Sequence, residues 1–559
     1  MTPASMPERS AAPAPPVRFP LRLRLSTFLP LAAVIVVPLV AAYAQWALLG
    51  LPAVPVSPHL TPETAARPFG FPAWVRITHF VNLLFMVLLI RSGLQILMDH
   101  PRLYWNVHCT PNTEWARLTP VEVPRDRVYT AKEDARNLTP WVGLPGGRHT
   151  LGLARHWHFA SALFWLMNGG VYLLLLFATG YWRRLVPTSW QVLPDAWAVF
   201  VHYATFHLPP EPNGFFQYNA LQQLSYFGVV FILAPLSILT GLGMSPALVN
   251  RFSWYPRIPG NRQVARSLHF LLLCGYVAFM IAHVSMVVIN GFARNMNHIV
   301  MGLDATHLIG MYIGLAGLSI LIALNVMANW VSWLFPRVVQ RSGDILVNPV
   351  VHLFLGGHAP RAEYSKGDIS PFMWPNGKMP TSNEWKVLAT NGFRDYRLKV
   401  YGLVENPVEL TLDELKLMNR QTQITLHHCI QGWSGIAEWG GLPMTALMEL
   451  VRPKPNVGAV IFYSFGEGGQ YAEGGGQYYD SHTLENVRHP QSLLAYEMNY
   501  QPLNELHGAP LRLRVENQLG FKMVKWIQAI EFVETVQHAY KGEGGYNADN
   551  EFFDSMADI

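Results

Sequence analysis

Cysteine and charge are both scarce in this chain. Three cysteines occur among 559 residues, Cys109, Cys274 and Cys429, so no CxxC pair or zinc cluster is possible around the last of them. Charged residues make up 14% of the chain, and half of its residues are hydrophobic. We find no stripe of basic and aromatic residues, so nucleic-acid binding is not expected.

Long hydrophobic runs are concentrated before residue 336 and approach or exceed the ~20 residues that cross a bilayer. We expect membrane spans over 28–51, 74–98, 157–181, 221–243, 266–291 and 306–335. The first run is either a retained helix or a signal peptide, since Ala42-Tyr43-Ala44 resembles a cleavage site. The long Pro/Ala-rich stretch before it, expected to be disordered over 1–27, favours the retained helix.

Basic residues gather in two of the loops between these runs, 99–155 and 244–265. The positive-inside rule therefore predicts that the N-terminus, both basic loops and the C-terminal domain lie in the cytoplasm. No twin-arginine signal is visible, which fits a cofactor domain that stays where it is made. The sequence predicts a multi-pass protein of the inner (cytoplasmic) membrane.

Composition changes after Pro336. A Gly/Pro-rich linker over 336–370 is expected to lead into a globular domain over 371–540, followed by a tail over 541–559. Short strands are predicted at 396–404, 422–430, 457–464, 510–515 and 527–536, with helices at 413–418 and 444–450. The glycine-rich stretch 466–476 lacks the lysine of a phosphate loop and is interpreted as a mobile loop over a site or as a plain surface hairpin. The domain is predicted to be α+β and rich in strands.

Cys429 ends one of these strands, where the glycine-rich turn Gln431-Gly432-Trp433-Ser434-Gly435 begins. A lone cysteine can be a buried filler, a nucleophile or a single thiolate ligand to a metal. Its place at a strand-to-turn boundary favours a side chain that projects into a cavity.

The segment from His428 to Ser434, followed by Trp439-Gly440-Gly441-Leu442-Pro443, resembles the molybdenum-ligand segment of the sulfite oxidase superfamily. The bacterial branch with the methionine sulfoxide reductase catalytic subunits is most similar. Further blocks agree in order, at 494–499, 507–513 and 520–526. The resemblance implies that the Cys429 thiolate binds molybdenum carried by a single molybdopterin, and a soft thiolate suits such a metal.

The same resemblance implies which residues hold the cofactor. The expected pterin and phosphate contacts are Asn376, Ser464, His507, Arg512, Met523, Val524 and Lys525. Much of the family has arginine before the ligand cysteine, where this chain has His428, a catalytic candidate. Histidine is cationic only when protonated, so the sequence favours a neutral oxygen-atom donor or acceptor over sulfite.

Four histidines in the membrane half form a pattern. His79, His158 and His269 each follow an arginine by three residues near the start of a span, and His283 lies fourteen residues after His269 on nearly the same helix face. Antiparallel alternation of the spans pairs His158 with His269 and His79 with His283. Two bis-histidine b-type haems are predicted, and interhelical hydrogen bonding is the alternative. His156 is the residue most easily confused with His158.

This arrangement resembles the cytochrome b subunits of formate dehydrogenases and nickel-iron hydrogenases over about residues 70–300, within a bundle expected over 70–335. The sequence thus predicts a multi-domain membrane protein, with a bundle of about six helices and a strand-rich molybdopterin domain. It would exchange electrons with quinone or quinol and reduce a small S- or N-oxide. A sulfite-type dehydrogenase and a non-catalytic electron-transfer module remain the alternatives. No oligomeric state is indicated.

Overall fold

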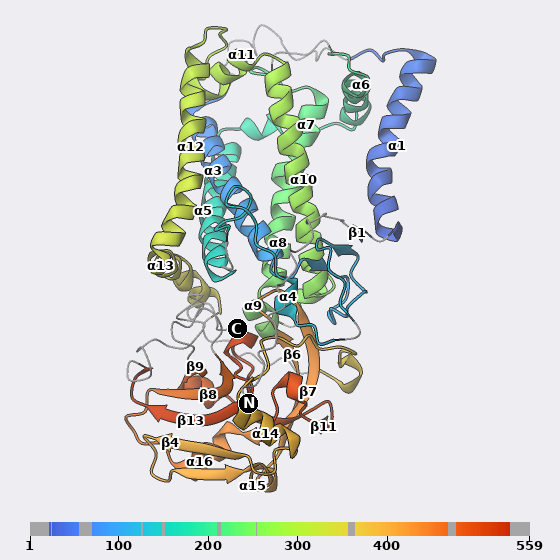
Figure 1. Cartoon of the computed structure of the whole chain (residues 1–559). Helices are drawn as coiled ribbons and strands as arrows, with labels where there is room; N and C mark the ends of the chain where they lie inside the picture. Colours follow the sequence, from blue (N-terminus) through green and yellow to red (C-terminus); the bar gives the residue numbers. More distant parts are fainter. Residues whose placement is uncertain are drawn as a thin grey trace, which may run out of the picture.

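The computed structural model describes residues 22–23, 25–54, 70–124, 127–147, 151–209, 214–252, 254–355, 364–467 and 477–536. It consists of a long helix bundle above a domain built from sheets (Figure 1). The expected C-terminal tail 541–559, most of the N-terminal segment 1–27 and residues 468–476 of the glycine-rich loop lie outside the described residues.

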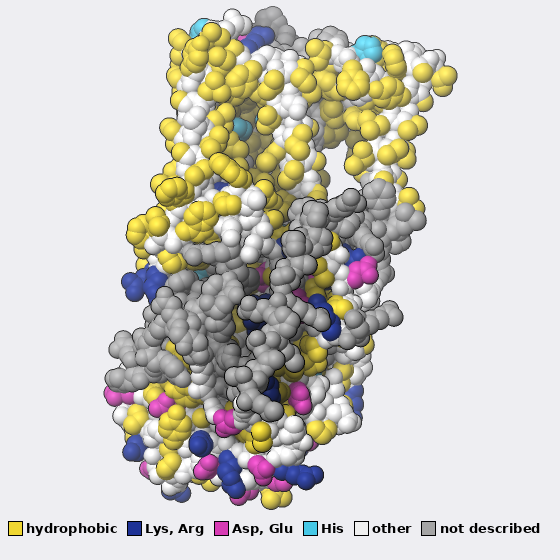
Figure 2. Space-filling model, in the orientation of Figure 1, with side chains coloured by type: hydrophobic (Ala, Val, Ile, Leu, Met, Phe, Trp, Pro, Cys, Tyr) yellow, Lys and Arg dark blue, Asp and Glu magenta, His cyan; other side chains and the backbone are white. Residues whose placement is uncertain are grey.

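Six helical segments of the described chain are long and apolar enough to cross a membrane. They are α1 (Leu25–Leu49), α3 (Ala73–Leu97), α5 (Leu151–Ala178), the continuous run α7–η2–α8 (Ala220–Met244), α10 (Arg262–Ile289) and α12 (Ile309–Leu334). The six predicted spans coincide with these segments to within six residues at each end. The chain is a multi-pass membrane protein, and its apolar side chains cover the upper part of the molecule (Figure 2).

Helix α10 begins where the sequence supplies a strong start signal. The Asn261 side chain accepts hydrogen bonds from the backbone N–H groups of Gln263 and Val264, which satisfies donors that have no partner inside the helix. The first turn of α10 lies at the end of the bundle nearest the sheets (Figure 1). This turn is one of the segments through which the bundle contacts the sheet domain.

The loop between α3 and α5, described over residues 98–124 and 127–147, folds compactly beside the sheets. We call this segment the excursion. It contains β2 (Arg102–Leu103), β3 (Ala116–Arg117) and α4 (Ala131–Asp134). Arg102 is fully buried, and its guanidinium donates to both carboxylate oxygens of Asp134 at 2.7 and 2.9 Å and to Glu114 at 2.9 Å. These ion pairs compensate the desolvation of the charges, so the excursion can pack without water around its centre.

The C-terminal domain contains two five-stranded sheets. One has the order β11-β10-β7-β6, with β12 also pairing β10, and comprises β6 (Gln421–His428), β7 (Ser434–Pro443), β10 (Ser492–Met498), β11 (Gln501–Pro502) and β12 (Arg512–Val515). The other has the order β5-β4-β13-β8-β9 and comprises β4 (Arg397–Gly402), β5 (Val408–Thr411), β8 (Ala459–Glu467), β9 (Gln477–Thr483) and β13 (Ile527–Val533). The strand-rich α+β prediction is confirmed. The short helices are α14 (Asn383–Thr390), α15 (Leu412–Leu417), α16 (Met444–Val451) and α17 (Leu484–Val487).

One difference from the sequence-based expectation concerns residues 336–355, which were expected to belong to the linker. They form the helix α13 (Pro336–Leu355), which starts one residue after α12. Proline is well accommodated at the first position of a helix, where no N–H partner is lost, so Pro336 starts this helix rather than a loop.

Candidate functional site

Cys429 lies in the tight turn between β6 and β7. The turn is closed by the Cys429 N–H, which donates to the Trp433 carbonyl at 3.2 Å, and by the Gly432 N–H, which donates to the Cys429 carbonyl at 3.1 Å. Gly432 has a φ of 103°, a conformation that side chains disfavour. Cys429 is 3% exposed, and burial raises the pKa of its thiol to about 12, so only a bound cation would keep it as a thiolate at neutral pH.

A cluster of buried cations lies beside this turn. Arg512 and Arg514 stack on the ring of Trp439, with guanidinium carbons 4.8 and 4.4 Å from its centroid. Arg514 is paired with Glu516 at 2.8 Å. Within the described part of the chain, no carboxylate forms an ion pair with Arg512, and its buried Nε has no hydrogen-bond partner.

Burial beside neighbouring cations lowers the pKa of Arg512 to about 9 and the pKa of Lys525 well below its usual range. A buried cluster with this excess of positive charge is suited to an anion. The phosphate of molybdopterin fits that requirement, and the residues present are therefore compatible with the cofactor.

The structure brings most of the predicted cofactor contacts into one neighbourhood. The Asn376 side chain faces the Cys429 sulfur, with Nδ2 3.9 Å from Sγ, and the Lys525 ammonium donates to the Asn376 carbonyl. The Ser464 hydroxyl donates to the Lys525 carbonyl at 2.7 Å. The His507 carbonyl accepts from Arg512 at 3.1 Å. Met523 and Val524, directly before Lys525, are buried.

The two histidines before Cys429 point in different directions, as alternating residues of a strand must. His427 Nδ1 accepts from Arg514 at 2.9 Å, whereas His428 Nε2 donates to the Asn250 side chain in the membrane half at 3.0 Å. Burial lowers the pKa of both histidines well below its usual value, and nearby arginines lower it further. Both imidazoles are therefore neutral.

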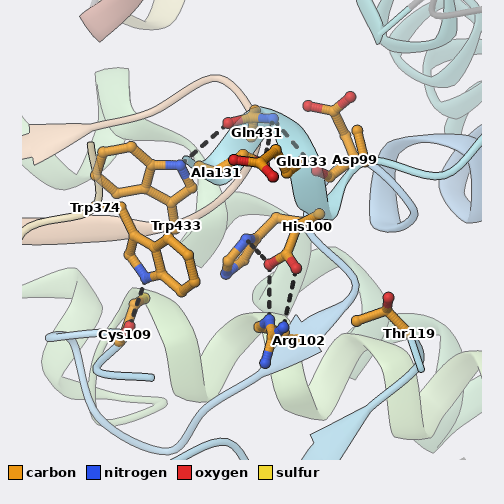
Figure 3. Close-up of polar contacts among 12 residues, drawn as sticks. Asp99, His100, Arg102, Cys109, Thr119, Ala131, Glu133, Trp374, Gln431 and Trp433 are labelled. Carbon is orange, nitrogen blue, oxygen red and sulfur yellow. Dashed lines mark hydrogen bonds and ion pairs between the residues drawn. The ribbon is translucent and has the colours of Figure 1, made fainter. Parts of the chain in front are cut away.

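The excursion between α3 and α5 contacts the Cys429 turn through Gln431 (Figure 3). The Gln431 amide donates to the carbonyls of Asp99 and Ala131, both at 3.3 Å, and its oxygen accepts from the Trp433 indole at 3.3 Å. Sequence reasoning missed these contacts, because backbone carbonyls three hundred residues away leave no local signal. The Arg102–Asp134 ion pair at the centre of the excursion was not predicted from the sequence either.

The membrane histidines meet in the predicted pairs. The ring centroids of His79 and His283 are 6.4 Å apart, and those of His158 and His269 are 6.5 Å apart. Two metal–nitrogen bonds of about 2 Å, with about 1 Å from each nitrogen to its ring centre, require roughly 6 Å. Both spacings therefore fit an iron between the rings, and no group of three or more metal-binding side chains occurs among the described residues.

Hydroxyl groups orient the imidazoles of the His158–His269 pair. The Ser92 hydroxyl lies 3.1 Å from His158 Nδ1, and the Thr240 hydroxyl lies 2.9 Å from His269 Nδ1. Each hydroxyl donates to a carbonyl four residues earlier in its own helix, so it accepts from the imidazole. This places the proton on Nδ1 and leaves Nε2 for a metal.

Helix α10 joins the His158–His269 pair to the Cys429 turn. Arg262 and Gln263, in its first turn, donate to the Gly432 carbonyl at 3.2 and 2.9 Å. Gln263 also donates to the Ser434 hydroxyl at 3.0 Å. His269 follows six residues later, which corresponds to about 9 Å along the helix.

These features define a membrane-bound molybdopterin oxidoreductase with a cytochrome b module. Residues 386–541 match the family model described as oxidoreductase molybdopterin binding domain, and residues 70–302 match the model described as prokaryotic cytochrome b561. The chain belongs to the molybdopterin-binding oxidoreductases and carries a cytochrome b561 domain in the same polypeptide. Its cofactor classes are molybdopterin with molybdenum and haem b.

Three curated relatives illustrate the similarity. A putative protein-methionine-sulfoxide reductase subunit, YedZ1, of Azospira oryzae is 34% identical over 27% of this chain and 54% of its own length. The protein-methionine-sulfoxide reductase catalytic subunit MsrP of Xanthomonas campestris is 32% identical over 27% of this chain and 48% of its own. The uncharacterized oxidoreductase YuiH of Bacillus subtilis is 30% identical over 33% of this chain and 89% of its own. The chain thus spans about half the length of the first two.

Proposed function

We propose that this protein oxidises a membrane quinol and reduces a small S- or N-oxide at the molybdenum bound by Cys429. Two electrons pass through two b-type haems, one held by His79 and His283 and the other by His158 and His269. For a sulfoxide, the quinol gives up two electrons and two protons and becomes the quinone, while the sulfoxide loses its oxygen atom as water and becomes the sulfide. Molybdenum supplies the site at which the oxygen atom leaves the substrate.

The observation that carries this proposal is the contact between the first turn of α10 and the Cys429 turn. One helix provides a ligand to each proposed haem, and the same helix donates hydrogen bonds to the Gly432 carbonyl. An electron donor and an acceptor are thereby held in one rigid arrangement inside a single chain. A fusion of this kind is useful when the outside electron partner is dissolved in the lipid.

The two histidines before Cys429 favour a neutral substrate, and the nearby guanidinium groups of Arg262 and Arg266 already donate to backbone carbonyls. His427 and His428 are buried and uncharged, so they supply no cation for an anion such as sulfite. Arg512 and Lys525 would be engaged with the cofactor phosphate. A neutral sulfoxide or N-oxide needs only hydrogen-bond donors, and the relatives named as methionine-sulfoxide reductases agree with this direction.

The charge distribution supports a cytoplasmic position for the catalytic domain in the inner membrane. The excursion after α3 and the loop before α10, which hold most of the basic loop residues, lie on the same side of the bundle as the sheets (Figure 1). A fluorescent protein fused to the C-terminus should therefore fluoresce in intact cells. Activity of a periplasm-dependent reporter at the same position would refute this orientation.

Metal analysis and turnover of the detergent-solubilised protein test the function together. We expect about two haem irons per molybdenum and reduction of dimethyl sulfoxide or trimethylamine N-oxide by menadiol. Haem reduction by sulfite alone would instead identify a dehydrogenase that feeds the quinone pool. Haem without molybdenum would leave only an electron-transfer module.

A further inference from the structure

Helix α13 presents an apolar stripe that no other part of the described chain covers. Val338, Ile345 and Leu353 are 55%, 74% and 78% exposed. They are spaced seven and eight residues apart, which places them on one face of the helix. Three large aliphatic side chains on one helix face are unfavourable in water.

The neighbouring face of α13 is fixed against the bundle. Gly343 packs so closely on α5 that a Cβ there would lie 2.7 Å from the His156 ring. His156 Nε2 lies 3.4 Å from an Asp344 carboxylate oxygen, and its Nδ1 is 2.8 Å from the Gly152 carbonyl. The orientation of α13 is therefore set by α5, and the apolar stripe cannot turn inward.

The position of α13 identifies what covers this stripe. Only Phe335 separates it from α12, the last membrane span, so its first turn starts at the level where α12 leaves the bilayer. In Figure 1 it lies obliquely beneath the bundle and above the sheets. Asp344 faces His156 on α5, whereas Arg341, three residues after Val338 and four before Ile345, lies at the edge of the stripe.

We propose that α13 lies in the interfacial layer of the leaflet that faces the catalytic domain. Its stripe of Val338, Ile345 and Leu353 is covered by phospholipid, at the boundary between headgroups and acyl chains. Amphipathic helices bind membranes in this way, parallel to the surface. The helix then holds the catalytic domain against the bilayer, and its contact with His156 fixes the end of α5 two residues before the haem ligand His158.

The position of the stripe can be measured with nitroxide labels on the full-length protein in phospholipid nanodiscs. In a Cys274→Ser background, we would label Ile345→Cys and Leu353→Cys and measure collision with oxygen and with a water-soluble nickel chelate. Ile320→Cys on α12, 61% exposed, is the acyl-chain control. Leu417→Cys on α15, 87% exposed, is the water control.

We expect both α13 labels to collide with oxygen several-fold more, and with the nickel chelate several-fold less, than the Leu417→Cys label does. Their ratio of oxygen to nickel collisions should lie between those of the two controls. Collision with the nickel chelate equal to that of the water control would overturn the proposal. Protection from both reagents would also overturn it, since a protein partner would then cover the stripe.

Two checks keep the test decisive. The Cys274→Ser parent, in which the remaining cysteines are buried, gives the background labelling. The haem absorption spectrum of each labelled protein should match the parent, which shows that the bundle is folded. Two labelled positions are used, so failure of one variant to fold leaves the other to decide.

Discussion

At the residue scale, one cysteine is proposed to hold the molybdenum and a pair of histidines each haem iron, and the neighbours of these residues support those roles. A buried cysteine by itself indicates no function, but Cys429 faces Asn376, whose carbonyl accepts a hydrogen bond from the buried cation Lys525. The histidine pairs were predictable because helix periodicity and alternation fix their faces. The contacts of the Ser92 and Thr240 hydroxyls with these histidines were not predictable, because a serine or threonine in a span more commonly bonds only to its own helix.

Cys429→Ser should abolish molybdenum binding and oxide reduction together, because a serine hydroxyl is a poor substitute for a soft thiolate. The haem absorption spectrum should not change. Elemental analysis and turnover with menadiol check both expectations. Cys274→Ala, on the exposed surface of α10, is the control and should keep its molybdenum. Full turnover of Cys429→Ser would mean that the metal is held elsewhere.

Ser92→Ala and Thr240→Val should each raise the midpoint potential of one haem only. A hydrogen bond from Nδ1–H makes the imidazole a stronger donor and favours ferric iron, so its loss favours the ferrous state. Potentiometric titration with optical detection resolves the two haems. Ser319→Ala, whose hydroxyl bonds to the carbonyl of Leu315 in its own helix, is the matched control. Equal shifts of both haems would contradict the assignment of these hydroxyls to the His158–His269 pair.

At the level of elements, α10 connects the membrane bundle to the C-terminal domain. It was predicted as a span with two haem ligands, and the structure adds that its first turn contacts the Cys429 turn. The excursion between α3 and α5 and the helix α13 were not predicted. Both depend on packing between segments far apart in sequence, such as Arg102 with Asp134 and Gly343 with His156, whereas periodicity reports only on local order.

Gln263→Leu should slow electron transfer between the haems and molybdenum several-fold without changing either haem potential. The substitution removes two buried hydrogen bonds and leaves the Gly432 carbonyl with fewer donors, a loss of about 1–3 kcal/mol in the docking of α10. Stopped-flow absorption of haem reoxidation by an N-oxide measures the rate. Gln223→Leu on α7, which loses a hydrogen bond to the Arg184 carbonyl remote from this contact, should behave like the parent. An unchanged rate in Gln263→Leu would show that α10 does not couple the two sites.

On the scale of the whole molecule, the chain combines two families, and in the proposed function electrons need not leave it. The fold class and both cofactor classes were predictable, since apolar runs and two separated motif blocks are strong signals. The two proposed haems are separated by about 21 Å along α10, because their ligands on that helix are fourteen residues apart. The pair formed by His79 and His283 is the one remote from the catalytic domain.

His283→Leu should therefore separate quinol oxidation from oxide reduction. Loss of the remote haem removes the acceptor for quinol electrons, so menadiol-dependent turnover should fall at least 100-fold, about 2.7 kcal/mol. Reduced methyl viologen, a soluble donor, should still drive oxide reduction at a comparable rate. Haem content should drop by one per chain. Normal menadiol turnover would place quinol oxidation at the other haem.

The most direct test of the account is whether an oxide reoxidises the haems through Cys429. The protein would be reduced anaerobically with one equivalent of menadiol per haem pair and mixed with trimethylamine N-oxide while the haem absorption is followed. We predict full reoxidation in the parent protein and none in Cys429→Ser. Equal reoxidation of both proteins would contradict the account, because electrons would then reach the substrate without the molybdenum site.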